Sequence, residues 1–204
     1  MQGVKEKALA LLQSGTVDRV LGWKAGEFFY DLTPAVFTTV EEIEKDFVWS
    51  AFSAANLSKY LIQESRKGGK VAAFLKPCDS YSFVQLLKEH RIWRDHVYVV
   101  GVQCDGMCDI DKIRAAGCKG VTAVTEDGDT LRVTTLTGEK TVNKQDVLLG
   151  RCTVCKSKKI VEFDELLGEQ GEELDSARFD EVAKLEAMTP EERYAFWRGE
   201  LSRC

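Results

Sequence analysis

The sequence has 204 residues, of which 44% are hydrophobic and 30% are charged. This length supports one main domain with a small appendage rather than two full domains. The formal net charge of -5 provides no basic footprint for DNA or an anionic membrane, so we expect no nucleic-acid partner.

The hydrophobic segments are too short for a membrane span, because charged residues or Gly interrupt each one well before roughly twenty residues. The N-terminal segment MQGVKEKALALLQSG has an acidic residue ahead of a short apolar run, unlike a signal peptide. We therefore expect a cytoplasmic protein. In a reducing cytosol, seven cysteines favour metal or redox chemistry over a disulfide framework.

The N-terminal part of the chain predicts a helix followed by a hairpin. Apolar residues at helical spacing indicate a helix over Val4–Gln13, with Gly15 as its stop. Two short strands are expected at Val17–Trp23 and Glu27–Asp31, and Pro34 is expected to end the extended run.

The middle of the chain predicts a βαβ unit. A helix over residues 50–66 leads into a strand at Lys70–Lys76, and a helix over Tyr81–His90 leads into a strand at Val97–Val100. Such units are almost always right-handed crossovers between parallel strands, so both strands end at the same edge of the sheet. In open α/β sheets this edge binds ligands.

The remaining chain predicts a β appendage and a helical C-terminus. We expect a helix over Ile110–Ala116 and an antiparallel hairpin or small meander over Val121–Val142. From Glu162 onward the chain is acidic and helical in character, with a helix start capped by Thr189. The predicted fold class is therefore α/β, with a mostly parallel sheet, flanking helices, a small antiparallel β appendage and a helical C-terminus.

Five cysteines follow the predicted strands: Cys78, Cys104, Cys108, Cys152 and Cys155. Thiolates that short loops bring together suit soft metals. The C-x-x-C spacing of the last two admits zinc, an iron–sulfur cluster or a redox dithiol. The dithiol is the least favoured, since the motif follows a meander rather than opening a helix after a βα unit.

The distribution of the cysteines bears on the choice between zinc and iron–sulfur. A structural zinc site usually stands on two nearby knuckles, whereas Cys78 and Cys104 follow two parallel strands at the ligand-binding edge. Gly101 and Gly106 flank Cys104, so backbone N–H groups could approach cluster sulfurs, or these could be ordinary loop glycines. The spacing favours an iron–sulfur cluster and leaves zinc open.

The other candidate residues have simpler explanations. Cys118 is expected to be a small buried hydrophobe. Lys24 and Lys76 could contact phosphates or a flavin ring, or could be surface lysines. His90 and His96 flank the outgoing end of the crossover helix, away from the cysteines, and are expected to be neither ligands nor bases. The sequence contains no G-x-G-x-x-G and no P-loop motif.

Residues 75–109, LKPCDSYSFVQLLKEHRIWRDHVYVVGVQCDGMCD, resemble a motif of the coenzyme F420 hydrogenase/dehydrogenase beta-subunit family. Upstream, SAANLSKYL at 53–61 resembles the helix before the first cysteine strand, and GRCTVC at 150–155 resembles the second C-x-x-C. The resemblance covers roughly residues 15–167 and looks closest to members associated with heterodisulfide reductase and formate dehydrogenase complexes.

The resemblance implies cofactors and site residues. Members of the family carry a [4Fe-4S] cluster, and several also carry FAD. By position, the implied cluster ligands are Cys78, Cys104, Cys152 and Cys155, with Cys108 as an alternative ligand. The implied flavin neighbourhood comprises Lys24, Ser53, Asn56 and Lys76.

The resemblance also implies a function and a division of the chain. Residues 1–168 would form the family-like α/β domain, and residues 169–204 a helical extension that reaches an incomplete ferredoxin-type motif at Cys204. The expected function is electron transfer within an anaerobic oxidoreductase complex, between a flavin, deazaflavin or ferredoxin-type donor and a partner enzyme. The expected partners are subunits of hydrogenase, formate dehydrogenase or heterodisulfide reductase type. The alternative is a non-catalytic, zinc-stabilised interaction module.

Overall fold

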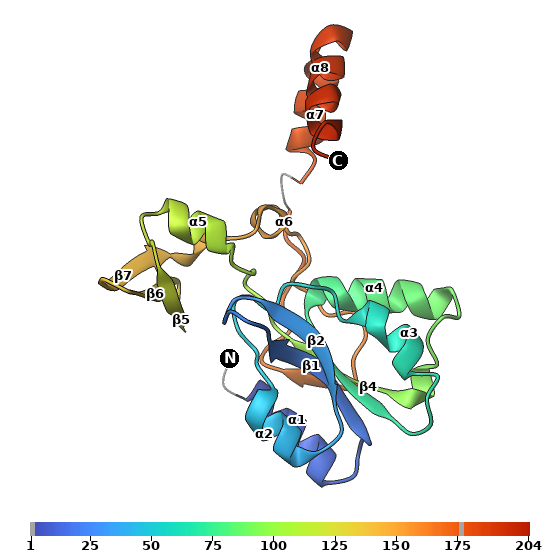
Figure 1. Ribbon diagram of the computed structural model, residues 1–204. Helices are drawn as coiled ribbons and strands as arrows, with labels where there is room; N and C mark the ends of the chain where they lie inside the picture. The colour runs from blue at the N-terminus through green and yellow to red at the C-terminus, as the bar shows by residue number, and fades with distance from the viewer. Residues whose placement is uncertain (1–2, 176–177) are drawn as a thin grey trace.

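The computed structural model describes residues 3–175 and 178–204, and a mixed sheet lies at its centre (Figure 1). Within these residues the sheet has five strands, in the order β2-β1-β3-β4-β8. Strands β1, β3, β4 and β8 run parallel, and the edge strand β2 is antiparallel to β1. The strands are β1 (Arg19–Ala25), β2 (Leu32–Phe37), β3 (Val71–Leu75), β4 (Val97–Val102) and β8 (Glu165–Leu167). The predicted fold class is confirmed.

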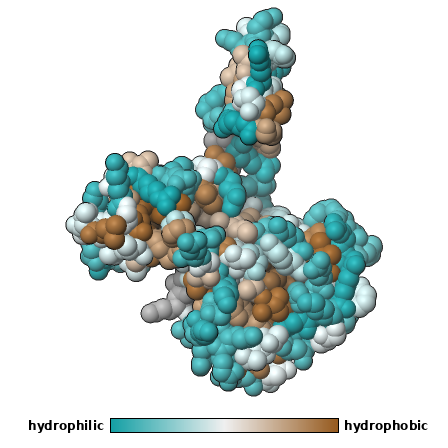
Figure 2. Space-filling view, viewed as in Figure 1, coloured by the Kyte–Doolittle hydropathy of each residue, from teal (hydrophilic) through white to brown (hydrophobic). Residues whose placement is uncertain are grey.

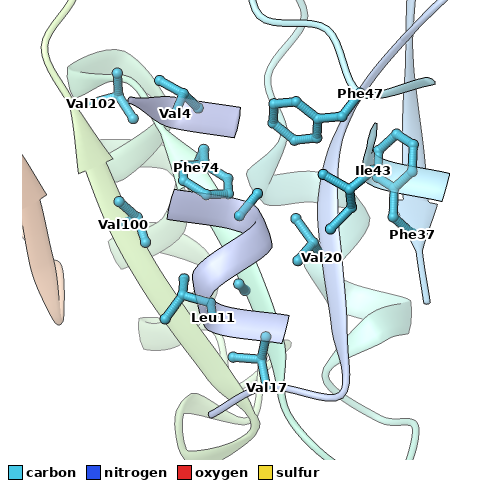
Figure 3. Close-up of a cluster of buried hydrophobic side chains, with 12 residues drawn as sticks. Val4, Leu11, Val17, Val20, Phe37, Ile43, Phe47, Phe74, Val100 and Val102 are labelled. Atoms are coloured by element: carbon cyan, nitrogen blue, oxygen red, sulfur yellow. The ribbon is translucent and has the colours of Figure 1, made fainter. Parts of the chain in front are cut away.

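One face of the sheet is covered by α1 (Val4–Gln13) and α2 (Val40–Asp46). Phe74 of β3 packs on this face, together with residues of both helices (Figure 3). The opposite face is covered by η1 (Ser58–Tyr60), α3 (Leu61–Glu64) and α4 (Pro77–Lys88). Every residue of β3 is buried, as expected for a parallel strand covered on both faces. A short helix, η2 (Arg94–His96), precedes β4.

The first hairpin differs from its prediction. Residues 27–31 form a turn, in which the backbone N–H of Gly26 donates to the carbonyl of Asp31 at 2.6 Å. The second strand instead includes Pro34, which was expected to end the extended run. Proline is tolerated there because β2 is an edge strand.

The predicted continuous helix over residues 50–66 is also wrong. Residues 50–57 form turns, and helical structure begins only at η1. The side chains of this segment bond to nearby backbone: Ser53 Oγ accepts from the N–H of Ser50 at 3.1 Å, and Asn56 Oδ1 accepts from the N–H of Ser58 at 2.9 Å. Such local bonds compete with a helix.

A second, antiparallel sheet forms the predicted appendage and confirms it as a meander. It consists of β5 (Val121–Asp127), β6 (Thr130–Thr135) and β7 (Gly138–Asn143). Two helices, α5 (Ile110–Ala115) and η3 (Lys144–Val147), complete its small core.

The C-terminal part contains both a correction and a confirmation. The region from Glu162, expected to be helical, includes strand β8, which extends the main sheet by pairing with β4. Beyond it lie the expected helices α7 (Asp180–Ala187) and α8 (Pro190–Leu201). Thr189 caps α8 as predicted, since its Oγ1 accepts from the N–H of Glu192 at 3.3 Å.

Helices α7 and α8 stand away from both sheets (Figure 1). No residue between 178 and 204 is buried, so these helices do not pack on the core. Apolar side chains lie on their surface (Figure 2), namely Phe179, Val182, Tyr194, Phe196, Trp197 and Leu201. Within the described residues, no helix combines the length and the apolar character that crossing a bilayer requires.

Candidate metal centre

Four cysteines from three separate segments line a single pocket at the carboxyl edge of the main sheet: Cys78, Cys104, Cys152 and Cys155. The strand order explains their meeting. Strands β3 and β4 are parallel neighbours, so the segments that follow them leave the sheet side by side. The structure therefore brings together the four thiols that the family resemblance implied as ligands.

Cys78 lies in the first turn of α4, close to the end of β3. The helix begins at Pro77, four residues before the predicted start, because proline is well suited to the first helical position. Cys78 is the most accessible of the four thiol residues, since it is exposed while the other three are partly buried. Its side chain therefore connects the pocket with the protein surface.

Cys104 lies in the loop after β4, and two backbone N–H groups of this loop point at sulfur atoms. The N–H of Gly106 donates to Cys104 Sγ at 3.4 Å, and the N–H of Met107 donates to Cys152 Sγ at 3.4 Å. Gly106 has a φ of 111°, a conformation that L side chains rarely adopt. Of the two glycines that flank Cys104 in the sequence, Gly106 thus places its backbone N–H against a cysteine sulfur.

The C-x-x-C segment is the third segment that lines the pocket, after those of Cys78 and Cys104. Cys152 lies in a short helix, α6 (Gly150–Thr153), although no helix was predicted at this motif. The Cys155 thiol donates to the carbonyl of Ser157 at 3.7 Å. Lys158 fixes this segment to the neighbouring loop, because its Nζ donates to the carbonyl of Cys104 at 3.0 Å.

The protein environment holds two of these thiols in the protonated form. Loss of solvent around the sulfur, followed by the negative charge of Asp79, raises the pKa of Cys78 to about 12, even though the residue as a whole is exposed. Burial also raises the pKa of Cys104, against the opposing effects of the Gly106 N–H and the Lys76 charge. A cation that binds these sulfurs must therefore displace protons.

Lys76, which lines the pocket, forms a buried ion pair with Asp79. Both side chains are 1% exposed, and Lys76 Nζ lies 2.9 Å from Asp79 Oδ2. The ammonium also donates to the carbonyl of Ser53 at 2.9 Å and to that of Ala55 at 3.2 Å. Burial raises the pKa of Asp79, and the charge and hydrogen bonds of Lys76 oppose this shift. No sequence pattern predicted the pair as a unit.

The residues of the implied flavin neighbourhood do not form one lining. Of the four, only Lys76 lines the cysteine pocket. The half-exposed side chain of Lys24 pairs with Asp46 at 2.7 Å, on the outer part of the hairpin. Ser53 and Asn56 cap backbone groups of their own loop through their side-chain oxygens.

The remaining cysteines lie elsewhere. Cys118 is fully buried in the core of the appendage, as predicted for a small hydrophobe. Cys108 belongs to the same core and does not line the pocket, and burial raises its pKa to about 11. Cys204 is exposed beyond α8.

The donor set of the pocket suits a cluster better than a single metal ion. In residues 3–175 and 178–204, no three His, Cys, Asp or Glu side chains meet closely enough to hold a single ion. An iron–sulfur cluster makes a different demand, because its cysteines bind different irons and surround the cluster. Soft thiol donors from several segments, with N–H groups directed at sulfur, fit a cluster of this kind.

The chain is similar in sequence to two curated beta subunits. No family model matches the chain. Over 96 residues it is 35% identical to the F420-dependent formate dehydrogenase 1 subunit beta of Methanococcus maripaludis, which covers 47% of this chain and 24% of the relative. It is 34% identical over 96 residues to the F420-dependent formate dehydrogenase subunit beta of Methanocaldococcus jannaschii, covering 47% and 25%. The predicted resemblance to F420-dependent beta subunits is confirmed.

A solved structure shares the fold of this beta-subunit-like chain. A chain in the F420-reducing [NiFe] hydrogenase complex from Methanosarcina barkeri aligns with a TM-score of 0.58 and 20% identity. The alignment covers 75% of this chain and 59% of the other. By sequence, the chain spans about a quarter of the length of the curated beta subunits that it matches.

Proposed function

We propose that this chain is an electron-transfer module that holds one [4Fe-4S] cluster on Cys78, Cys104, Cys152 and Cys155. The observation that carries the proposal is the convergence of these four thiols on one pocket from three separate segments. In the proposed function, the module passes electrons between a flavin, deazaflavin or ferredoxin-type donor and a partner enzyme of an anaerobic oxidoreductase complex.

The chemistry of the pocket supports a cluster. When bound, the cluster would supply one-electron transfer, so no side chain need act as an acid or a base. The chain's own part is to hold and tune: the cysteines provide anionic sulfur, and the N–H groups of Gly106 and Met107 stabilise negative charge on sulfur. The proposed location is the cytoplasm, a reducing compartment in which cysteines stay available as ligands.

The proposed electron route leaves the protein near Cys78. This cysteine is exposed, and Arg151 from the pocket wall is exposed as well. Short distances favour electron transfer, so a partner would dock at this edge of the sheet. The proposed partners are subunits of a hydrogenase, formate dehydrogenase or heterodisulfide reductase type of complex, a proposal supported by the two relatives described above as formate dehydrogenase beta subunits.

FAD is the second cofactor of the proposal. It is supported by the resemblance to F420-dependent subunits. Acid precipitation of the purified protein should release a yellow flavin with its own absorption spectrum. If no flavin is released, a module with the cluster alone remains.

Anaerobic purification of the full chain tests the cluster directly. The protein should be brown, with broad charge-transfer absorption and about four irons per chain. Colourless protein with a single zinc would contradict the proposal. That outcome would instead support the alternative of a zinc-stabilised interaction module.

A further inference from the structure

A buried ammonium and a buried carboxylate lie side by side against the cysteine pocket. Lys76 and Asp79 are each 1% exposed, and their charged atoms are 2.9 Å apart. All three protons of the Lys76 ammonium have acceptors, namely the Asp79 carboxylate and the carbonyls of Ser53 and Ala55. Lys76 therefore has no free N–H for a flavin phosphate and is held as a fixed charge.

Stability alone does not account for this pair. The desolvation of two charges can exceed their mutual attraction, so an apolar pair of similar size is often as stable or more stable. Asp79 also stands at the third position of α4, where its carboxylate accepts from the N–H of Lys76 at 3.4 Å. The amide oxygen of an asparagine at this position could accept the same hydrogen bond without any buried charge. The feature that needs an explanation is the buried cation.

The two charges act differently on the cysteines. The Cys78 thiol donates to Asp79 Oδ1 at 3.8 Å, so the carboxylate directly faces this sulfur. Lys76 lines the pocket together with all four cysteines. An ammonium at this place favours negative charge in the pocket, and the carboxylate beside the Cys78 sulfur opposes it.

Resting on the proposed function, we propose that Lys76 and Asp79 are positioning residues that set the reduction potential of the bound cluster. One-electron reduction by a donor adds one negative charge to the cluster, and no proton need be transferred. The fixed ammonium stabilises this reduced state, and the fixed carboxylate destabilises it. Removal of the two charges should therefore shift the potential in opposite directions.

The test is a set of anaerobic redox titrations on the full chain, with dithionite as reductant and the cluster followed by absorption or EPR. At the wild-type midpoint, Lys76→Met should raise the ratio of oxidised to reduced cluster about tenfold, equal to about 59 mV for a one-electron couple. Asp79→Asn should lower this ratio. Lys76→Arg, which keeps the charge, should stay within about threefold of the wild type.

A second buried ion pair provides the matched control. Arg19 and Glu64 are each 9% exposed in their side chains and 3.1 Å apart, and Arg19 pairs with Val71 at the opposite end of the sheet. The double variant R19M/E64Q should leave the ratio unchanged. If Lys76→Met fails to fold, Asp79→Asn carries the test, because it leaves Lys76 with its two carbonyl acceptors.

The outcomes separate this inference from the proposed function. If the wild-type protein binds no iron, the proposed function itself fails. If the wild type is loaded, the inference is overturned when Lys76→Met and Asp79→Asn leave the potential unchanged or shift it in the same direction. A shift of similar size in the control pair would likewise overturn it.

Discussion

The amino ends and the carboxyl ends of the parallel strands form two opposite edges of the main sheet. Each of these edges has a buried ion pair, in different surroundings. At the amino edge, Arg19 ties β1 to α3: its guanidinium contacts Glu64 and the carbonyls of Glu64 and Gly68. At the carboxyl edge, Lys76 and Asp79 lie beside thiols. The same type of interaction thus joins elements at one edge and shapes the electrostatics of a pocket at the other.

The largest expected effect comes from removing a thiol at the carboxyl edge. Cys78→Ser should lose more than half of the iron, because the segment after β3 would no longer supply a ligand. Metal analysis of anaerobically purified protein measures this. Cys118→Ala is the control, since Cys118 is buried in the appendage core and should keep the full iron content. Full iron retention in Cys78→Ser would remove Cys78 from the ligand set.

The amino edge should respond in stability rather than in iron. Arg19→Met leaves the Glu64 carboxylate buried without its guanidinium partner, so we expect a loss of about 3 kcal/mol in the free energy of unfolding. Urea denaturation of the apoprotein measures the loss. The iron content of the folded variant should equal that of the wild type. Iron loss without any loss of stability would show that the two edges are not independent.

A pH titration extends the comparison to Cys108, which is buried in the appendage core and does not line the pocket. Burial raises the pKa of Cys108 from 9.0 to about 11, so the folded state binds its proton more tightly than the unfolded state. The stability contributed by this protonated thiol is complete below pH 9 and should fall as the pH rises toward 11, by about 2 kcal/mol. Urea denaturation of the apoprotein between these pH values measures the fall. Cys108→Ala should show a smaller one.

The smallest effect is expected in the C-terminal helices, which belong to neither edge. Thr189→Ala removes the side-chain acceptor for the N–H of Glu192 and should cost α8 about 1 kcal/mol of local helix stability. Circular dichroism should show slightly reduced helicity. The unfolding midpoint of the sheet should not change, because no residue between 178 and 204 is buried. A lower midpoint would indicate contacts between α8 and the sheet.

Sequence patterns predicted the parts of the fold that local chemistry determines. Parallel strands with cysteines at one edge were predicted from three local signals. These are the β-branched run that begins at Val97, the apolar strand before Pro77 and the crossover helix between them. The capped start at Thr189 was also correct. A comparable signal was overlooked at Thr39, which forms a capping box with Glu42 at the start of α2.

The remaining features depend on contacts between distant segments. Strand β8 is only three residues long, and its pairing with β4 outweighs the acidic character of its surroundings. Pro34 can lie within a strand because β2 is an edge strand, a position that depends on the order of the whole sheet. At the site, the family pattern included Lys76 and Asp79, but their mutual contact depends on the turn from β3 into α4.

The distribution of the thiols over three segments has a consequence for biosynthesis. A compact zinc knuckle can fold around its metal, because its ligands are neighbours in the unfolded chain. Here Cys78 and Cys104 become neighbours only after β3 and β4 have paired, and Cys152 reaches them from beyond the appendage. We therefore expect β3 and β4 to pair first, so that insertion of a cluster would be a late maturation step on an already folded apoprotein.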